Sequence, residues 1–173
     1  MPNILFTQSC VRSCPYCFAK KHMSESSPED VISWEDLIYL ADFLLSAGER
    51  HFPILGGEPT LHPDFCSMVL YLLERGFSIN VFTSGVLADR KLDEAFDSFK
   101  NVPHDRLSFT CNLNDPSTPN TPIAETESVK RFLRAFGERV TPGFNIYRKN
   151  FDLDFLFRYI NEFGLRRHIR MGV

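Results

Sequence analysis

The sequence predicts an α/β fold with parallel strands, because six short β-rich runs alternate with five amphipathic helical patterns along its 173 residues. Neighbouring parallel strands need a long crossover connection, and the intervening helices supply it. The length suits one domain with a substantial buried core, so residues 1–173 are expected to form one domain. Periodicity alone leaves two arrangements open, an open doubly wound sheet and a partial barrel.

The expected strands are short runs rich in β-branched, aromatic and aliphatic residues, each bounded by polar or turn-forming residues. They cover residues 4–7, 52–55, 77–82, 107–111, 144–147 and 168–171.

The first two expected helices carry start and stop signals at both ends. Ser33 is a favourable N-cap with Asp36 three residues later, and Gly48 supplies a left-handed C-terminal stop. The second helix has Pro63 in its first turn and ends at Gly76. Both segments therefore read as complete helices.

The other three expected helices are recognised by an apolar stripe or by their end signals. One stripe lies within residues 92–99, and a second lies within residues 129–136 and stops at Gly137. The last helix follows Asp152 and stops at Gly164. A polar loop rich in Pro, Ser, Thr and Asn is expected at residues 115–122.

Composition excludes several classes of protein. Hydrophobic residues make up 43% and charged residues 24% of the chain, which is typical of a globular protein and not of a disordered one. The net charge of -3, without an extended Lys/Arg tract, gives no nucleic-acid footprint. No apolar run is long enough to cross a bilayer, and residues 1–10 lack the pattern of a signal peptide. The cytoplasm is the expected compartment.

Three of the five cysteines are crowded into one motif that follows the first strand. The run Cys-Val-Arg-Ser-Cys-Pro-Tyr-Cys places Cys10, Cys14 and Cys17 on a single loop. This pattern is typical of metal ligation in a reducing compartment. Structural zinc usually takes four protein ligands, whereas three thiolates leave one iron of a four-iron cluster open to another ligand. Cys66 and Cys111 lie within a helix and a strand and are expected to be small core residues.

A second motif, Gly-Gly-Glu-Pro at residues 56–59, follows the second strand. Gly56 and Gly57 permit a tight turn and a close approach of the backbone to a ligand, while Glu58 offers a carboxylate to an amine. Because both motifs follow parallel strands, they are expected at the same end of the sheet.

Together the two motifs resemble the signature of the radical S-adenosylmethionine (SAM) superfamily. The resemblance implies a partial (β/α)6 barrel, a [4Fe–4S] cluster on Cys10, Cys14 and Cys17, and SAM chelating the fourth iron. It further implies an enzyme in which the reduced cluster cleaves SAM to methionine and a 5′-deoxyadenosyl radical that abstracts hydrogen from a substrate. Gly56, Gly57 and Glu58 would face the methionyl amine.

The same resemblance extends to four other candidate cofactor contacts and names no catalytic acid or base. Tyr16 holds the aromatic position before the last cysteine, near the adenine. Thr-Ser-Gly around Ser84 resembles the family's Thr-Asn-Gly, and the Asn-Leu-Asn run that begins at Asn112 resembles its Ser-x-Asp. Asn145, on the fifth strand, is the weakest of these matches.

The resemblance also suggests partners. An electron donor of the flavodoxin or ferredoxin type is expected, and Lys20, Lys21 and His22 follow the cysteine loop where such an acidic protein would dock. A peptide or protein is the expected substrate class, on resemblance alone. Family members often continue beyond the sixth strand, so residues 1–173 are expected to be the core domain, with truncation after the sixth strand as one reading of its end.

Two alternatives remain open at this point. The cysteines could belong to a non-catalytic iron–sulfur or zinc module for electron transfer or structure, with the Gly-Gly-Glu-Pro motif coincidental. The chain could also be a degenerate radical-enzyme fold that acts as a scaffold. Binding of SAM separates the first alternative from a radical enzyme, and cleavage of SAM separates the second.

Overall fold

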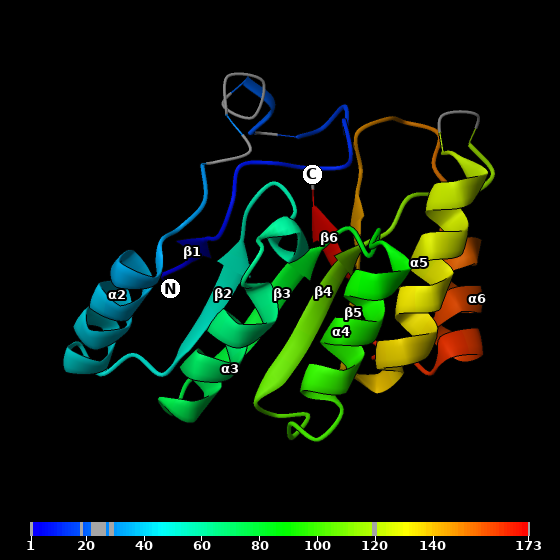
Figure 1. Ribbon diagram of the computed structural model, residues 1–173. Helices are drawn as coiled ribbons and strands as arrows, with labels where there is room; N and C mark the ends of the chain where they lie inside the picture. The colour runs from blue at the N-terminus through cyan, green and yellow to red at the C-terminus, as the bar shows by residue number, and fades with distance from the viewer. Residues whose placement is uncertain (1, 18, 22–26, 28–29, 119–120, 173) are drawn as a thin grey trace.

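The computed structural model describes residues 2–17, 19–21, 27, 30–118 and 121–172. Six strands and five longer α-helices alternate along these residues, with two short 3-10 turns (Figure 1). In chain order the elements are β1 (Ile4–Leu5), α2 (Trp34–Ser46), β2 (His51–Leu55), η1 (Pro59–Leu61), α3 (Phe65–Glu74), β3 (Ser78–Thr83), α4 (Asp89–Phe99), β4 (Leu107–Asn112), α5 (Ile123–Phe136), η2 (Gly137–Arg139), β5 (Val140–Asn145), α6 (Asp154–Phe163) and β6 (Arg170–Gly172).

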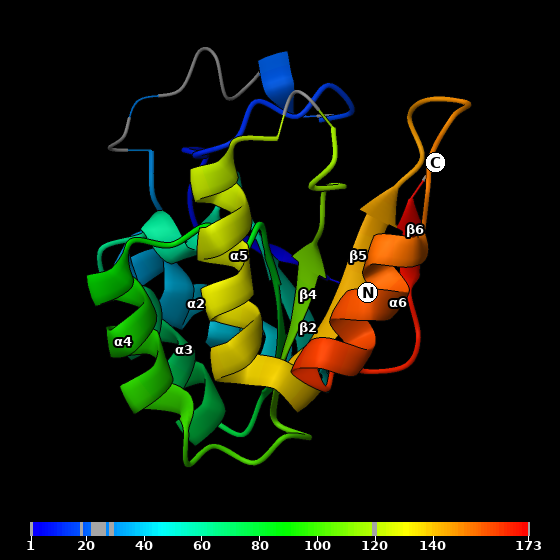
Figure 2. The same cartoon turned by 90° about the vertical axis from the view of Figure 1, so that its right-hand side faces the viewer.

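The strands form one fully parallel sheet in the order β1-β2-β3-β4-β5-β6. Each crossover connects one strand to its neighbour in the same direction along the sheet, and all crossovers have the same hand. Every helix therefore lies on the same face of the sheet. Figures 1 and 2 show the helices along one side of a curved sheet. No pairing joins β6 to β1 within the described residues, so the sheet stays open. The predicted partial (β/α)6 barrel is confirmed.

Helix ends follow the local signals in the sequence. The Ser33 side chain accepts a hydrogen bond from the Asp36 amide (3.0 Å) and donates its hydroxyl to the Asp36 carboxylate (2.7 Å), which caps α2. Gly164 ends α6 in the left-handed conformation with a φ of 63°.

The core lies between the sheet and the helices. Strand residues that face the helices are fully buried, as Phe52, Ile54, Ile79 and Val81 illustrate. Phe109 of β4 packs against two phenylalanines of α5 with ring centroids 4.7 and 5.4 Å apart. Alternate strand residues point to the opposite, concave face and are mostly half-buried.

The observed strand boundaries differ most at β5, which spans Val140–Asn145 and not the predicted 144–147. Pro142 and Gly143 look unfavourable for a strand in the sequence, but both lie in register with β4, opposite Cys111 and Asn112. β1 is also shorter than predicted, and β6 begins two residues later. The local pattern therefore located the strands, whereas pairing with neighbours set their ends.

Within the described residues, none of the helices is both long and apolar enough to span a membrane. His22 and two residues of the predicted polar loop, 119 and 120, lie outside the described residues.

Candidate functional site

The three-cysteine loop begins directly beyond β1, at the carboxyl end of the sheet. Cys10, Cys14 and Cys17 are all half-buried, and none of them forms a disulfide with a described residue. Backbone hydrogen bonds shape the loop, including one from the Cys17 amide to the Cys14 carbonyl oxygen (3.2 Å). The Arg12 amide donates to the Cys10 sulfur (3.4 Å). All three thiols are therefore presented by one short, ordered turn of chain.

Gly57 and Glu58 of the second motif hold this loop through hydrogen bonds to its backbone. The Gly57 amide donates to the Thr7 carbonyl and the Glu58 amide donates to the Ser9 carbonyl, both at 2.8 Å. A Cβ on Gly56 would lie 2.6 Å from the Thr7 carbonyl oxygen, and one on Gly57 would overlap the carbonyl oxygen of Ser9. Glycine is required at both positions because the backbone of this segment lies directly against the backbone of residues 7–9.

The Glu58 carboxylate is completely buried and accepts five hydrogen bonds. Thr60 donates its amide and hydroxyl to Oε1, and the Thr83 hydroxyl donates to the same oxygen at 2.8 Å. Ser84 donates its amide (2.7 Å) and its hydroxyl (2.6 Å) to Oε2. Glu58 thus ties the end of β2 to the end of β3. A ligand amine that reached Glu58 would have to replace one of these bonds.

Arg12, inside the cysteine motif, ties the loop to α5 and to the end of β4. Its Nη2 forms an ion pair with Glu125 of α5 (2.8 Å), with the two side chains 5% and 16% exposed. Its Nη1 donates to the carbonyl of Asn112 at the end of β4 (2.6 Å). Glu125 also accepts a hydrogen bond from Asn114 (3.3 Å). The loop is therefore fixed both to β2 and to β4 and α5.

Tyr16 makes a further contact between the loop and the ends of β4 and β5. Its hydroxyl donates to Asn114 Oδ1 (3.0 Å), and its ring lies 5.0 Å from that of Tyr147, centroid to centroid. Burial raises the pKa of the Tyr16 phenol well above its ordinary value, so the hydroxyl stays a donor at neutral pH.

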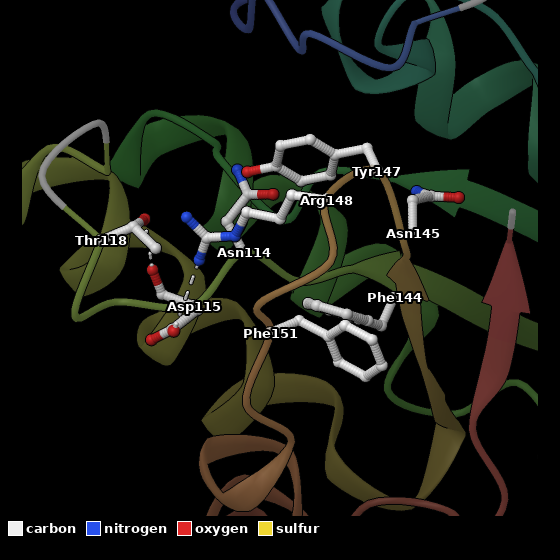
Figure 3. A pocket seen from close by; sticks show the side chains of 8 residues that line it. All are labelled: Asn114, Asp115, Thr118, Phe144, Asn145, Tyr147, Arg148 and Phe151. Carbon is white, nitrogen blue, oxygen red and sulfur yellow. Dashed lines mark hydrogen bonds and ion pairs between the residues drawn. The ribbon is translucent and has the colours of Figure 1, made fainter.

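A small hollow opens beside this contact, between the loop after β4 and the loop after β5 (Figure 3). Its floor includes the rings of Phe144 and Phe151, and its rim carries an ion pair between Arg148 and Asp115 (4.0 Å). The hollow has both an apolar surface and charged groups, next to the cysteine loop.

Asn112 and Asn145 occupy equivalent places at the ends of β4 and β5. Each lies in register with a glycine of the next strand, Gly143 and Gly172 respectively. A Cβ on either glycine would collide with the Oδ1 of the facing asparagine. Asn145 points from β5 toward β6 (Figure 3). The Oδ1 of Asn112 is buried without a hydrogen-bond partner in the part of the chain that the structure describes.

The donor set of the loop fits an iron–sulfur cluster. Three soft thiol donors lie on one loop. Burial raises the pKa of the Cys10 and Cys14 thiols, so binding to iron has to displace their protons. Among the described residues, no three His, Cys, Asp or Glu side chains already converge closely enough to chelate a metal ion. The other two cysteines, Cys66 and Cys111, are buried in α3 and β4, as predicted, and add no fourth ligand to the loop.

All the residues predicted for the site lie at the carboxyl end of the sheet. The structure adds groups that the sequence analysis did not single out, namely Arg12, Thr60 and Glu125. It also gives contacts to Thr83 and Asn114, which stand within the Thr-Ser-Gly and Asn-Leu-Asn runs. Arg12 lies between Cys10 and Cys14, and a charged residue inside the cysteine motif was the one sequence feature that could have indicated an ion pair at the site. His62, which lies between η1 and α3, is buried, and its two ring nitrogens are hydrogen-bonded to the Ile32 carbonyl and the Asp64 amide.

Comparison with known proteins agrees with this architecture. The family model described as the Radical SAM superfamily matches residues 4–149. The PqqA peptide cyclase of Gluconobacter oxydans is 28% identical over 172 residues, covering 96% of this chain and 45% of that protein. The S-adenosylmethionine-dependent nucleotide dehydratase of Selenomonas ruminantium is 35% identical over 86 residues, covering 49% of this chain and 30% of that protein.

Two solved structures share the fold. Streptococcus suis SuiB superposes with a TM-score of 0.69 at 16% identity, over 99% of this chain and 39% of that one. TYW1 with a lysine-pyruvate adduct bound superposes with a TM-score of 0.62 at 14% identity, over 98% of this chain and 62% of that one. The chain thus spans less than half the length of the two relatives compared by sequence. Because the family model covers most of the chain and the fold agrees with it, the chain belongs to the radical SAM superfamily, whose cofactors are a [4Fe–4S] cluster and SAM.

Proposed function

We propose that this chain is the core of a radical SAM enzyme that acts on a peptide, with Cys10, Cys14 and Cys17 as the three protein ligands of the [4Fe–4S] cluster. The observation that carries the proposal is the loop itself. The loop carries three half-buried cysteines within eight residues. It is attached to the end of β2 through Gly57 and to α5 through Arg12. Three thiolates, with no fourth ligand beside them among the described residues, suit a cluster that shares one iron with a second molecule.

When bound, the cluster and SAM together supply a one-electron reductive cleavage that yields methionine and a 5′-deoxyadenosyl radical. The protein supplies position and exclusion of water. In our proposal, Gly56, Gly57 and Glu58 line the methionyl end of SAM. The other proposed cofactor contacts surround the same end of the sheet: Tyr16, Ser84, Asn112 and Asn145.

A peptide is the proposed substrate class because the match to a peptide cyclase extends over nearly the whole chain. That similarity covers 96% of the chain, whereas the similarity to the nucleotide dehydratase covers 49%. The extent of the match supports a peptide over a nucleotide.

We also propose that a flavodoxin or ferredoxin delivers the electron. Lys20 and Lys21 are exposed and follow the cysteine loop, where they present positive charge to an acidic donor. Reduction of the cluster by purified flavodoxin should then slow steeply as salt increases.

The test of the cofactor chemistry is anaerobic reconstitution with iron and sulfide, followed by SAM and dithionite and measurement of 5′-deoxyadenosine. We expect product from the wild-type chain and none from Cys14→Ala. Cys66→Ala is the matched control, because it removes a thiol outside the loop and should keep both the cluster and the product. A wild-type protein that holds a cluster but never cleaves SAM would contradict an enzymatic role and favour the electron-carrier or scaffold alternatives.

The substrate class is tested separately with a library of peptides built from deuterated amino acids. Hydrogen abstraction from a peptide transfers deuterium into 5′-deoxyadenosine, which mass spectrometry detects. Nucleoside triphosphates with a deuterated ribose serve as the comparison. Transfer from the nucleotides and not from the peptides would reject the peptide assignment while leaving the radical chemistry in place.

A further inference from the structure

The concave face of the sheet, opposite the helices, is lined by neutral polar side chains. Asn80 of β3 donates to the Thr110 hydroxyl of β4 (3.1 Å), and Ser108 donates to Asn80 Oδ1 (3.4 Å). Thr141 of β5 lies opposite Thr110 and within 3.4 Å of His168 Nε2. These strands face the core with apolar side chains on their other side, so a polar layer on this face serves something other than the core.

The strand positions on this face carry a positive charge and no carboxylate. The described strand residues that point to it, from β3 to β6, are Ser78, Asn80, Phe82, Ser108, Thr110, Asn112, Thr141, Gly143, Asn145, Arg170 and Gly172. Arg170 supplies the charge, and no Asp or Glu occurs in the set. The face is therefore complementary to an anion.

Arg170 lies across this face and does not extend away from it. It is in register with Gly143, and its guanidinium carbon lies 5.3 Å from the centre of the Phe82 ring on β3. A Cβ on Gly172 would lie 3.7 Å from Arg170 Nη1 and would also collide with the Asn145 amide oxygen. The guanidinium and the Asn145 amide thus meet beside a glycine that leaves room for both.

The guanidinium contacts an aromatic ring but has no anionic partner among the described residues. Stacking on an aromatic ring orients an arginine while leaving its N–H donors free to bind a carboxylate. Arg170 is exposed and forms no ion pair with any described residue. Nearby, the Asn112 Oδ1 is buried and lacks a hydrogen-bond partner among the described residues. An Oδ1 acceptor needs an N–H or O–H donor and not a carboxylate. A peptide offers both kinds of group, since its carboxylate can bind the Arg170 guanidinium and a backbone N–H can donate to Asn112.

We infer that Arg170, oriented by Phe82 and flanked by Asn112 and Asn145, binds a carboxylate of an acidic peptide on the concave face of the sheet. This inference rests on the proposed function and names the chemistry of its substrate. The face ends at the proposed cofactor site, since Asn112 and Asn145 belong to both. An acidic residue held by Arg170 would place the neighbouring part of the peptide close to that site.

The test measures binding to the reconstituted chain directly, by fluorescence anisotropy of a hexaglutamate peptide that carries a neutral dye. Hexaglutamine and hexalysine peptides with the same dye are the comparisons. We expect Arg170→Gln to weaken hexaglutamate binding about tenfold, because hydrogen bonds to charged groups contribute more than neutral ones. Arg170→Lys should give an intermediate loss, since lysine keeps the charge but cannot form the planar, stacked fork.

Arg167→Gln is the matched control, because Arg167 is exposed and lies outside the strand. We expect it to change binding by no more than about twofold, since exposed charges away from the ligand are screened by salt. Equal losses in the Arg167 and Arg170 variants would show general attraction to positive charge and would overturn the inference. Equal binding of hexaglutamine and hexaglutamate would also overturn it.

Two carboxylates could reach Arg170, one from an acidic peptide and one from the methionyl group of SAM. Adding saturating SAM to the binding assay distinguishes them. Hexaglutamate binding that persists with SAM present supports a peptide site, whereas binding that SAM displaces assigns Arg170 to the cofactor and overturns the inference. Formation of 5′-deoxyadenosine by the wild-type chain is measured in the same preparation. That readout tests the proposed function alone, so failure of the cofactor chemistry and failure of the peptide site are distinguishable.

Discussion

Glu58→Gln is the substitution that best separates two roles for this carboxylate. The sequence motif predicts that Glu58 faces the amine of SAM. In the structure both of its oxygens are already occupied by donors from Thr60, Thr83 and Ser84. A role in cofactor contact predicts a loss of SAM binding, whereas a role in fixing the ends of β2 and β3 predicts a loss of stability in the apo protein.

The magnitude follows from the donors around the side chain. A glutamine has one oxygen, so its NH2 group must face one of the two sets of donors. On one side it meets the Ser84 amide, and on the other the Thr60 amide, and a backbone N–H cannot reverse its role. A buried N–H left without an acceptor costs about 1–3 kcal/mol, and the remaining bonds lose their charge assistance. We therefore expect a loss of about 3 kcal/mol in the free energy of unfolding.

The assay is urea unfolding of the apo protein followed by far-UV circular dichroism, with Glu74→Gln as the control. Glu74 is exposed at the end of α3, so its substitution should change stability by less than about 0.5 kcal/mol. For a domain of this size, a loss of 3 kcal/mol also lowers the melting temperature by roughly 6–12 °C. If Glu58→Gln changes apo stability no more than the control does but abolishes SAM binding, the reasoning from the five hydrogen bonds is refuted.

Two further predictions concern the fixation of the cysteine loop. Gly57→Ala forces a Cβ into the backbone of the loop, so we expect about 1–3 kcal/mol of destabilisation and a reduced iron content after reconstitution. Gly48→Ala, which has open space but a φ of 78°, is the control; it should lose some stability and keep the iron, and equal iron loss in both variants would refute the steric argument. Replacing Glu125 alone by Met leaves Arg12 buried without its partner and should cost about 3 kcal/mol in unfolding free energy, whereas the double replacement of Arg12 and Glu125 by Met should recover most of it. Urea unfolding of the wild type, the two single variants and the double variant measures the coupling free energy between Arg12 and Glu125. Additive effects would show that the two side chains are not coupled in solution.

The fold was predictable to the extent that local signals decide it. Caps and stops such as Ser33, Gly48 and Gly164 act within one turn of helix, so the sequence indicates where α2 and α6 end. β5 was placed several residues too late because Pro142 and Gly143 disfavour a strand locally. Hydrogen bonding to β4 and β6 on its two sides outweighs that preference.

The motifs located both halves of the site but not the contacts between them. The cysteine run and the Gly-Gly-Glu-Pro run are visible as short patterns, and they do meet at one end of the sheet. The ion pair between Arg12 and Glu125 joins residues more than a hundred positions apart, and the partner oxygen on Asn112 is a backbone carbonyl. No periodicity or spacing encodes such a pair, because it depends on how α5 packs after the loop has been placed.

The fixation of the loop also bears on how the fold and the cluster depend on each other. Small zinc domains take their folding free energy from the metal, because they have little core without it. Here the loop is attached by backbone bonds to Gly57 and Glu58 and by the side chain of Arg12, and the phenylalanine-rich core lies on the other side of the sheet. These contacts join protein groups to one another, and none of them uses a cysteine sulfur. We therefore expect them to place the loop independently of iron. If the anchors act in this way, a cysteine variant should lose iron while keeping its stability, whereas an anchor variant should lose stability and, through the displaced loop, some iron as well.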